Sequence, residues 1–579
     1  MSRDVAPARW LRWAGPTYAL TLTCAILAPL FRPGYLLLRD AVSTPRSYVS
    51  DAALGLTEAA PRALPQDFAV ALATRLLDGG TVLKVALVAG LWLAGCGAAR
   101  LVAAVLPQAG LAGQFVAITI AIWNPYVAER LLQGHWSLLV GYGCLPWVAV
   151  AMLALRAEGR SGFALAFWIA LAGLTPTGLL LAATVALVCV LAPGSGRPRW
   201  LCTATALAVA VAAALPWLTA MVWAPSSGGA RTGVAAFAAR AEPGLGTLGS
   251  LTGLGGIWNA DALPASRATP IALAATIVLV GVVVVGLPAV ARQPAAVPLL
   301  GLAGVSVLVL AVLATGPGLA VLDAVIETVP GVAVLRDGQK WVALAVPGYA
   351  LAGAGAVVSL RRWARPAVTA SLLCAALIAA LPDLGWGAGG KINPVRYPTG
   401  WPAVAAAINA DPHTVAVLPA DTMRRFGWSG PAPVLDPLPR WVRADVLSTG
   451  DLTISGQTVP GEGSRARAVQ TLLLSGGAPA ALARAGVGWV VVESGTDGEL
   501  GAAARTLRQL PVIYRDADLT LYRVGGDTPV APADRRRAAV TAHLGWLILV
   551  SGGAAGAAFG SIRRRRRCRF DQCAVTARH

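Results

Sequence analysis

Long apolar runs separated by short polar gaps dominate the chain. Many of these runs reach the roughly 18 residues that predict a transmembrane helix. We expect membrane spans at 14–31, 81–106, 111–126, 137–155, 162–174, 178–193, 200–223, 270–290, 295–316, 341–360, 366–382 and 539–561. The pattern therefore predicts a polytopic α-helical membrane protein of about 12 spans.

The run from 162 to 193 can be interpreted as one tilted helix or as two short ones. It contains Thr175-Pro176-Thr177-Gly178 at its centre. Proline removes a helix hydrogen bond and glycine weakens the helix, so together they favour a break. We expect two short helices.

The distribution of arginine predicts the orientation. Arginines precede the first span and recur in the short gaps "RAEGR", "GSGRPR", "ARQP", "RRWAR" and the tail "RRRRRCR". Positive charge marks cytoplasmic loops. We therefore expect a plasma-membrane protein with both termini in the cytoplasm and with loops 32–80, 224–269 and 317–340 outside. The same distribution explains the net charge of +19 without nucleic acid as a partner.

The composition agrees with a membrane protein. Of all residues 56% are hydrophobic and 13% are charged, against about a quarter charged in soluble domains. One long stretch differs. Residues 383–538 are more polar and alternate helical patterns with short strand patterns, such as "TVAVLPA" and "GWVVVES". This predicts an extracytoplasmic α/β domain between the membrane domain, 1–382, and a last helix with a basic tail, 539–579.

Charged residues gather at the predicted outer surface. Glu129, Arg130 and His135 lie between two spans, in "WNPYVAERLLQGHWSLLVGYGCLPW". Charge at membrane depth is costly and therefore suggests function, although Glu129 and Arg130 could also lie in the headgroup layer. Asp40, beside Arg39, follows the first span. Such a loop residue is more often simply solvated.

The segment "LRDGQKW" places Arg336 and Lys340 above a late span. These cations could bind a phosphate or anchor the helix end. No cluster with metal-ligand spacing predicts a metal site or another cofactor, and a divalent metal remains an open alternative.

Together these residues supply a carboxylate base, cations for a phosphate and apolar spans for a lipid tail. Transfer of a sugar from a lipid-phosphate donor needs these parts. We expect Asp40 and Glu129 to be catalytic, and Arg39, Arg130, His135, Arg336 and Lys340 to bind the donor. Trp428 and Trp441 suit stacking on the acceptor sugar, although a place in the core is the commoner role for such residues.

Several segments resemble a known family. "NPYVAERLLQGHWSLLVGYGCLPW", "VLRDGQKW", "YPTGWPAVAAAIN", "VAVLP" and "VLDPLPR" are similar to segments of the GT-C glycosyltransferase superfamily. The likeness is to its YfhO-like bacterial members and to the membrane part of mycobacterial-type arabinofuranosyltransferases. It implies a polyprenyl-phosphate sugar donor, an outward-facing site and a first-loop acid as base, which Asp40 matches. The chain departs from the family in lacking a paired acidic motif there. It has "RD" instead, which leaves the base and the activity open.

The sequence therefore predicts a membrane glycosyltransferase that modifies a cell-envelope glycan or lipid, with membrane lipids around it. The alternative is a protein without this activity: a transporter or flippase, or a scaffold for envelope glycan assembly. A transporter would carry polar residues through the midplane of its spans. Here the candidate residues crowd one interface, which favours chemistry at the membrane surface.

Overall fold

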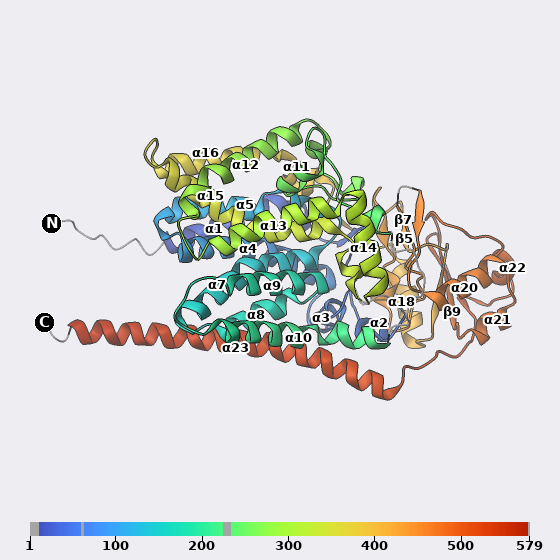
Figure 1. Cartoon of the computed structure of the whole chain (residues 1–579). Coiled ribbons are helices and arrows are strands. Elements are labelled where there is room, and N and C mark those ends of the chain that lie inside the picture. Colours follow the sequence, from blue (N-terminus) through green and yellow to red (C-terminus); the bar gives the residue numbers. More distant parts are fainter. Residues whose placement is uncertain (1–10, 59–62, 224–232, 330, 455, 577–579) are drawn as a thin grey trace.

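The computed structural model describes residues 11–58, 63–223, 233–329, 331–454 and 456–576, with side chains as far as 560. A bundle of long helices, the membrane part, carries a smaller α/β part at one end (Figure 1). The start of α1 (Leu11–Leu27) and the far end of α23 (Ala533–Thr576) lie at the opposite end of the bundle.

The helices of the membrane part follow the predicted runs. After α1 they are α4 (Gly79–Val105), α5 (Gly110–Ile122), α6 (Pro125–Leu132), α7 (Trp136–Glu158), α8 (Gly162–Ala172), α9 (Pro176–Cys189), α10 (Arg199–Trp223), α12 (Ile271–Val290), α13 (Val297–Leu313), α14 (Gly316–Thr328), α15 (Val346–Leu360), α16 (Pro366–Ala379) and α23. Each predicted span contains one of these helices.

The number of spans is lower than the predicted twelve. Within the described residues, eight helices are long and apolar enough to cross a membrane, and ten if each of two bent helix pairs forms one span. The difference comes from the short helices α8 and α9, with 11 and 14 residues. At 1.5 Å per residue they are about 17 and 21 Å long, less than the roughly 30 Å of a bilayer core. The polytopic helical class is confirmed.

The expected break within 162–193 is present. Thr175 ends the turn after α8, and its hydroxyl accepts a hydrogen bond from the Gly178 amide at 3.0 Å. Pro176 occupies the first turn of α9, where its missing N–H costs nothing. A local N-cap therefore divides the run into two helices.

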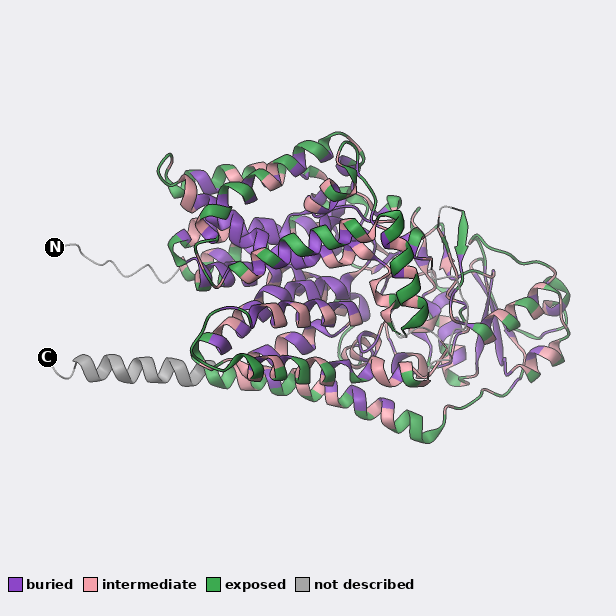
Figure 2. Ribbon diagram, viewed as in Figure 1, coloured by how far each residue is buried: buried purple, intermediate pink, exposed green. Residues whose placement is uncertain are grey.

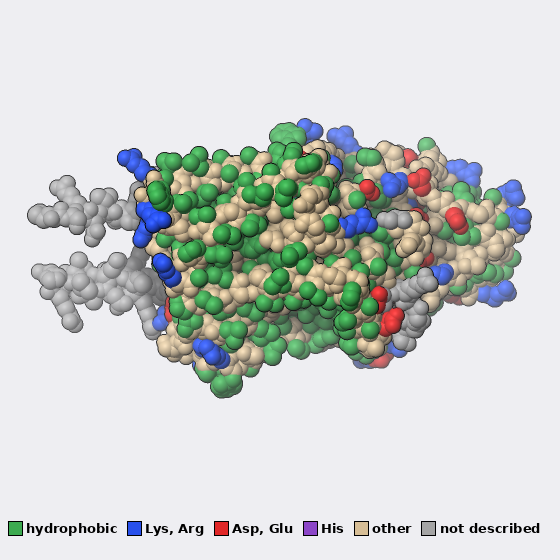
Figure 3. All heavy atoms as spheres, turned by 45° about the horizontal axis from the view of Figure 1, so that its top comes forward, with side chains coloured by type: hydrophobic (Ala, Val, Ile, Leu, Met, Phe, Trp, Pro, Cys, Tyr) green, Lys and Arg blue, Asp and Glu red, His purple; other side chains and the backbone are tan. Residues whose placement is uncertain are grey.

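Burial divides the bundle into inner and outer helices. Helices α5, α7 and α15 are mostly buried, whereas α10, α12 and α23 show exposed faces (Figure 2). Exposed apolar side chains such as Val211, Ile277 and Ile548 cover those faces. Figure 3 shows the resulting hydrophobic surface, with Lys and Arg at the end away from the α/β part. This is the surface that a lipid bilayer requires.

The loop between α1 and α4, which the sequence predicts to lie outside, is built into the α/β part. Strand β1 (Tyr35–Leu38) pairs antiparallel with β2 (Ala41–Val42) and also with β3 (Pro394–Val395), which gives the order β2-β1-β3. Leu37 and Val42 are buried in the core of the α/β part. The short helices α2 (Asp51–Leu54) and α3 (Gln66–Ala73) complete the loop.

The α/β part is centred on a four-stranded sheet of order β10-β11-β9-β4. Strands β4 (Val415–Leu418) and β9 (Trp489–Glu493) run parallel, and β11 (Leu519–Arg523) pairs antiparallel with β9 and with β10 (Val512–Arg515). Successive side chains of a strand point to opposite faces of the sheet. Accordingly, Val490 belongs to one buried hydrophobic cluster and Val491 to another. The predicted α/β class is confirmed.

Helices and hairpins complete this part. They are α18 (Gly400–Ala410), α19 (Leu438–Trp441), α20 (Ser464–Leu474), α21 (Pro479–Arg484), α22 (Ala504–Leu507), the pair β5 (Met423–Arg424) and β6 (Val434–Leu435), and the pair β7 (Leu452–Ile454) and β8 (Gln457–Val459).

Candidate active site

Asp40 lies in the tight turn between β1 and β2. The preceding residue, Arg39, has φ of +50°, in the left-handed region that L-residues rarely adopt. Backbone hydrogen bonds hold it there: its amide donates to Pro433 at 2.8 Å, and its carbonyl accepts from Leu435 at 2.9 Å. The turn is thus fixed between the membrane part and the α/β part.

Arg39 itself is buried and occupied. Its guanidinium donates to the carbonyl oxygens of Leu132 at 2.5 Å and Asp261 at 2.7 Å. Arg39 is 5% exposed, and the donor-binding role expected from the sequence stays a prediction. It holds the Asp40 turn against the end of α6.

The Asp40 carboxylate is bound on one oxygen only. Its Oδ2 accepts hydrogen bonds from Gln133 Nε2 at 3.0 Å and from His135 Nε2 at 2.9 Å. Among the described residues no hydrogen bond reaches Oδ1, and 38% of the side chain is exposed. The arrangement leaves one oxygen available to an incoming hydroxyl.

Arg130 sets the tautomer of His135. One guanidinium nitrogen of Arg130 lies 3.1 Å from His135 Nδ1. Because arginine can only donate, Nδ1 must be the acceptor, and the imidazole proton must lie on Nε2. His135 therefore donates to Asp40. Burial, helped by the charge of Lys340, lowers the pKa of His135, so the ring is neutral at neutral pH.

The same contacts keep Asp40 ionised. Burial raises its pKa, but the hydrogen bonds from His135 and Gln133 and the charge of Lys340 outweigh burial and lower the pKa to about 2. Asp40 is thus a carboxylate over the whole physiological range.

A buried ion pair between Arg130 and Asp337 lies next to His135. Arg130 donates to both oxygens of Asp337, at 2.7 and 3.2 Å, and also to Gln339. Trp258 donates to the same carboxylate at 3.3 Å. Arg130 is fully buried, and its charge is neutralised by Asp337. In this position Arg130 orients His135. The donor-binding role expected from the sequence stays a prediction.

Glu129 is buried close to the same ion pair, because Gln339 contacts both Arg130 and Glu129. It has no exposure, and its Oε2 accepts from the Ile257 amide at 3.1 Å and from Gln339 at 2.8 Å. Through these hydrogen bonds Glu129 joins α6 to the loop after α11 (Gly246–Thr252). Its catalytic role stays a prediction.

Two cations remain at the rim of the site. Lys340 is 23% exposed, lies 3.7 Å from Asp337, and influences the pKa of both Asp40 and His135. Arg336 stacks on Phe237, with its guanidinium carbon 4.1 Å from the ring centre. Of the basic residues expected to bind a phosphate, Lys340 is the one with an exposed charge next to Asp40.

The two tryptophans expected to bind the acceptor are packed in an aromatic cluster. Trp441 is 5% exposed and stacks on Trp401, with ring centres 6.1 Å apart, and Trp428 stacks on Phe426 at 5.0 Å. Trp441 therefore acts as a core residue of the α/β part, the commoner of the two roles weighed from the sequence. Among the described residues, no group of three or more His, Cys, Asp or Glu could hold a metal ion.

Some hydrogen-bond partners of the site residues stand in the segments that the sequence singled out, and others do not. Gln133 stands in "LLQGHW" and Asp337 in "LRDGQK". Asn259, which donates to Gln133 at 2.8 Å, and the Glu242–Arg267 ion pair come from a loop with no distinguishing pattern. Only the tertiary structure brings that loop to the site.

This architecture is a helical membrane bundle with an α/β part built onto the loop that follows its first helix. The structure of the arabinofuranosyltransferase AftD from Mycobacteria matches with a TM-score of 0.55 and 18% identity, over 91% of this chain and 42% of that chain. The expected likeness to mycobacterial-type arabinofuranosyltransferases is thus confirmed for the fold, and this chain spans less than half the length of that neighbour. No family model and no curated protein matches the sequence.

Proposed function

We propose that this protein is a glycosyltransferase that moves a sugar from a polyprenyl-phosphate donor to a glycan or lipid acceptor of the cell envelope. The observation that carries the proposal is the Asp40 carboxylate. It is ionised, held on Oδ2 by His135 and Gln133, and partly exposed beside Lys340. The resemblance in fold to AftD supports the same chemistry.

In the proposed reaction Asp40 acts as the general base. Oδ1 takes the proton from an acceptor hydroxyl, whose oxygen then attacks the anomeric carbon of the donor sugar. The bond from that carbon to the phosphate oxygen breaks as the new glycosidic bond forms, so the configuration inverts. Lys340 stabilises the charge that develops on the leaving polyprenyl phosphate.

The proposed topology places this reaction at the outer face of the plasma membrane. Both termini lie in the cytoplasm, and the α/β part lies outside, because the arginine-rich gaps mark the inner side. The apolar faces of the bundle hold the protein among lipids, where a polyprenyl donor also resides.

The test is transfer of radiolabelled arabinofuranose from its polyprenyl-phosphate donor by the full chain in lipid nanodiscs. Asp40→Asn is expected to lower the rate at least a hundredfold, in line with the loss of a general base. Asp497→Asn, at an exposed aspartate of the α/β part, is the matched control and should transfer normally. Full activity of Asp40→Asn would refute the assignment.

Inactive wild type with arabinofuranosyl, mannosyl and glucosyl donors alike would refute the enzyme proposal and favour a scaffold or transporter. Addition of EDTA to the same assay tests whether a divalent cation takes part.

A further inference from the structure

A cavity lies between the loop that follows α1 and the α/β part. Its volume is about 680 Å³. Residues 46–58 form one wall, residues 443–448 form the facing wall, and the segment before α23 closes one end. None of the residues of the Asp40 site lines it. It is therefore a separate site.

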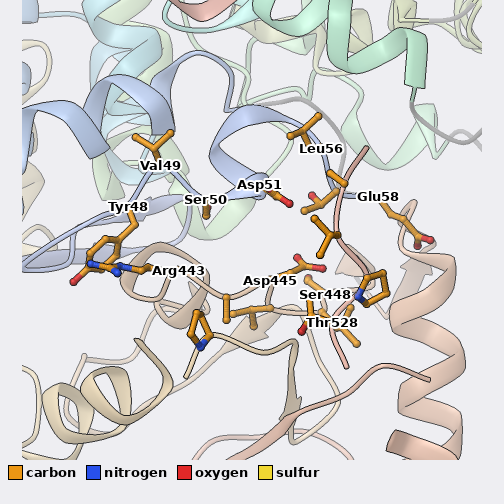
Figure 4. A pocket seen from close by; sticks show the side chains of 18 of the residues that line it. Tyr48, Val49, Ser50, Asp51, Leu56, Glu58, Arg443, Asp445, Ser448 and Thr528 are labelled. Carbon is orange, nitrogen blue, oxygen red and sulfur yellow. The ribbon is translucent and has the colours of Figure 1, made fainter. Parts of the chain in front are cut away.

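The polar groups of this cleft are arranged in a way that suits hydroxyl groups. Figure 4 shows Arg443 and Tyr48 at one end and Asp51, Asp445 and Ser448 towards the other. The exposed guanidinium of Arg443 rests on the Tyr48 ring, 4.9 Å from its centre. It offers donors at one end, while the carboxylates offer acceptors at the other.

Each of the two carboxylates, Asp51 and Asp445, is paired with an arginine through one oxygen. Asp51 contacts Arg536 through Oδ1, and Asp445 lies 3.8 Å from Arg465 through Oδ2. Among the described residues no hydrogen bond or ion pair reaches the other oxygen of either group. Burial raises the pKa of Asp445, with the nearby charges of Asp51 and Glu58 adding to the effect. Each of these two carboxylates is matched by the charge of its arginine, so this end suits an uncharged ligand.

We propose that this cleft binds a neutral oligosaccharide, the segment of the acceptor glycan that lies beyond the reacting sugar. The free carboxylate oxygens accept from sugar hydroxyls, and Arg443 and Ser448 contribute donors. The cleft is close enough for this. Tyr48 follows Asp40 by eight residues, so the two are at most about 28 Å apart along the chain. The inference rests on the proposed function, because it takes the ligand to be the acceptor.

Binding is measured by calorimetry without any donor, on the full chain in nanodiscs. The probes are linear tetrasaccharides of α-arabinofuranose and α-mannose, with inorganic phosphate as the anionic comparison. Ser448→Trp fills the cleft at an exposed residue, and Arg443→Ala removes the donor. Gln457→Trp, at an exposed residue of β8 outside the cleft, is the matched control.

We expect saturable binding of at least one tetrasaccharide, at least tenfold weaker in Ser448→Trp and Arg443→Ala and unchanged in Gln457→Trp. Absence of saturable binding of both sugars, equal binding by all variants, or binding of phosphate alone would each overturn the proposal.

The outcome is separable from that of the proposed function. Asp40→Asn is expected to bind the tetrasaccharide normally while failing to transfer. A cleft that binds sugar in a protein without transferase activity would refute the enzyme but not the cleft. Normal transfer to long acceptors by both cleft variants, with an unchanged KM, would refute the cleft and leave the enzyme intact.

Discussion

The hydrogen bonds that Asp40 accepts determine whether its carboxyl group is ionised. Left to burial alone, the carboxyl would have a raised pKa and would be a poor candidate for an ionised base. The donors His135 and Gln133 reverse that effect. Arg130 enters the site indirectly, by fixing the imidazole proton on Nε2.

His135→Ala should therefore move the acid limb of the pH–rate profile upward. A hydrogen bond to a charged group contributes about 1.5–3 kcal/mol, which corresponds to roughly 1–2 pKa units. Because the ionised form is the active one, a raised pKa removes activity as the pH falls through a higher value. The measurement is kcat/KM between pH 2 and 7, a range that contains the acid limb of both wild type and variant. Superimposable profiles for His135→Ala and wild type would exclude this role.

The buried pair of Arg130 and Asp337 gives a second prediction at this scale. Asp337→Leu leaves the Arg130 charge without its partner, and such losses typically cost about 3–5 kcal/mol. The double variant Asp337→Leu/Arg130→Met should recover part of the thermal stability of the detergent-purified protein. A double variant less stable than both single variants would show that the pair is not a unit.

At the scale of elements, small residues allow the inner helices to approach. A side chain on Gly143 of α7 would overlap the carbonyl oxygen of Gly90 on α4. By contrast, nothing lies within 4 Å of a side chain built on Gly281 of α12. Close packing of this kind is the principal attraction between helices in a membrane.

Gly143→Val should thus lower the melting temperature, with a cost of about 1–3 kcal/mol or more from overpacking. Gly281→Val, the matched control on a lipid-facing helix, should leave the melting temperature within error. Equal shifts for the two variants would mean that the α4–α7 contact does not limit stability.

At the scale of the whole molecule, the loop between α1 and α4 joins two parts that the chain order separates. Strand β1 lies in the loop after α1, yet it pairs with β3 at the start of the α/β part. Glu58 accepts hydrogen bonds from Ser464 at 3.2 Å and from the Arg465 amide at 2.8 Å. These contacts fix Asp40 and the cleft relative to each other.

The predicted orientation can be tested on intact cells. Cysteine introduced at exposed Gln457 should react with a membrane-impermeant maleimide, whereas cysteine at exposed Arg362, between α15 and α16, should react only after the cells are opened. Labelling of both positions in intact cells would contradict the assignment of the arginine-rich gaps to the cytoplasm.

The sequence by itself determined the helical membrane class, the positions of the helices, the break at Thr175 and the α/β character of residues 383–538. These features follow from local patterns, namely apolar runs, capping residues and strand alternation. It also singled out Asp40, His135 and Lys340, because charge next to a span is unusual.

The division of roles among the charged residues was decided only by the tertiary structure. Glu129 and Arg130 adjoin His135 in sequence, but helix periodicity turns them towards a loop more than a hundred residues away, where they are enclosed. Arg39 is likewise occupied by carbonyl oxygens from distant segments. Whether a charge meets a buried partner or a substrate depends on such long-range contacts, and no local pattern encodes them.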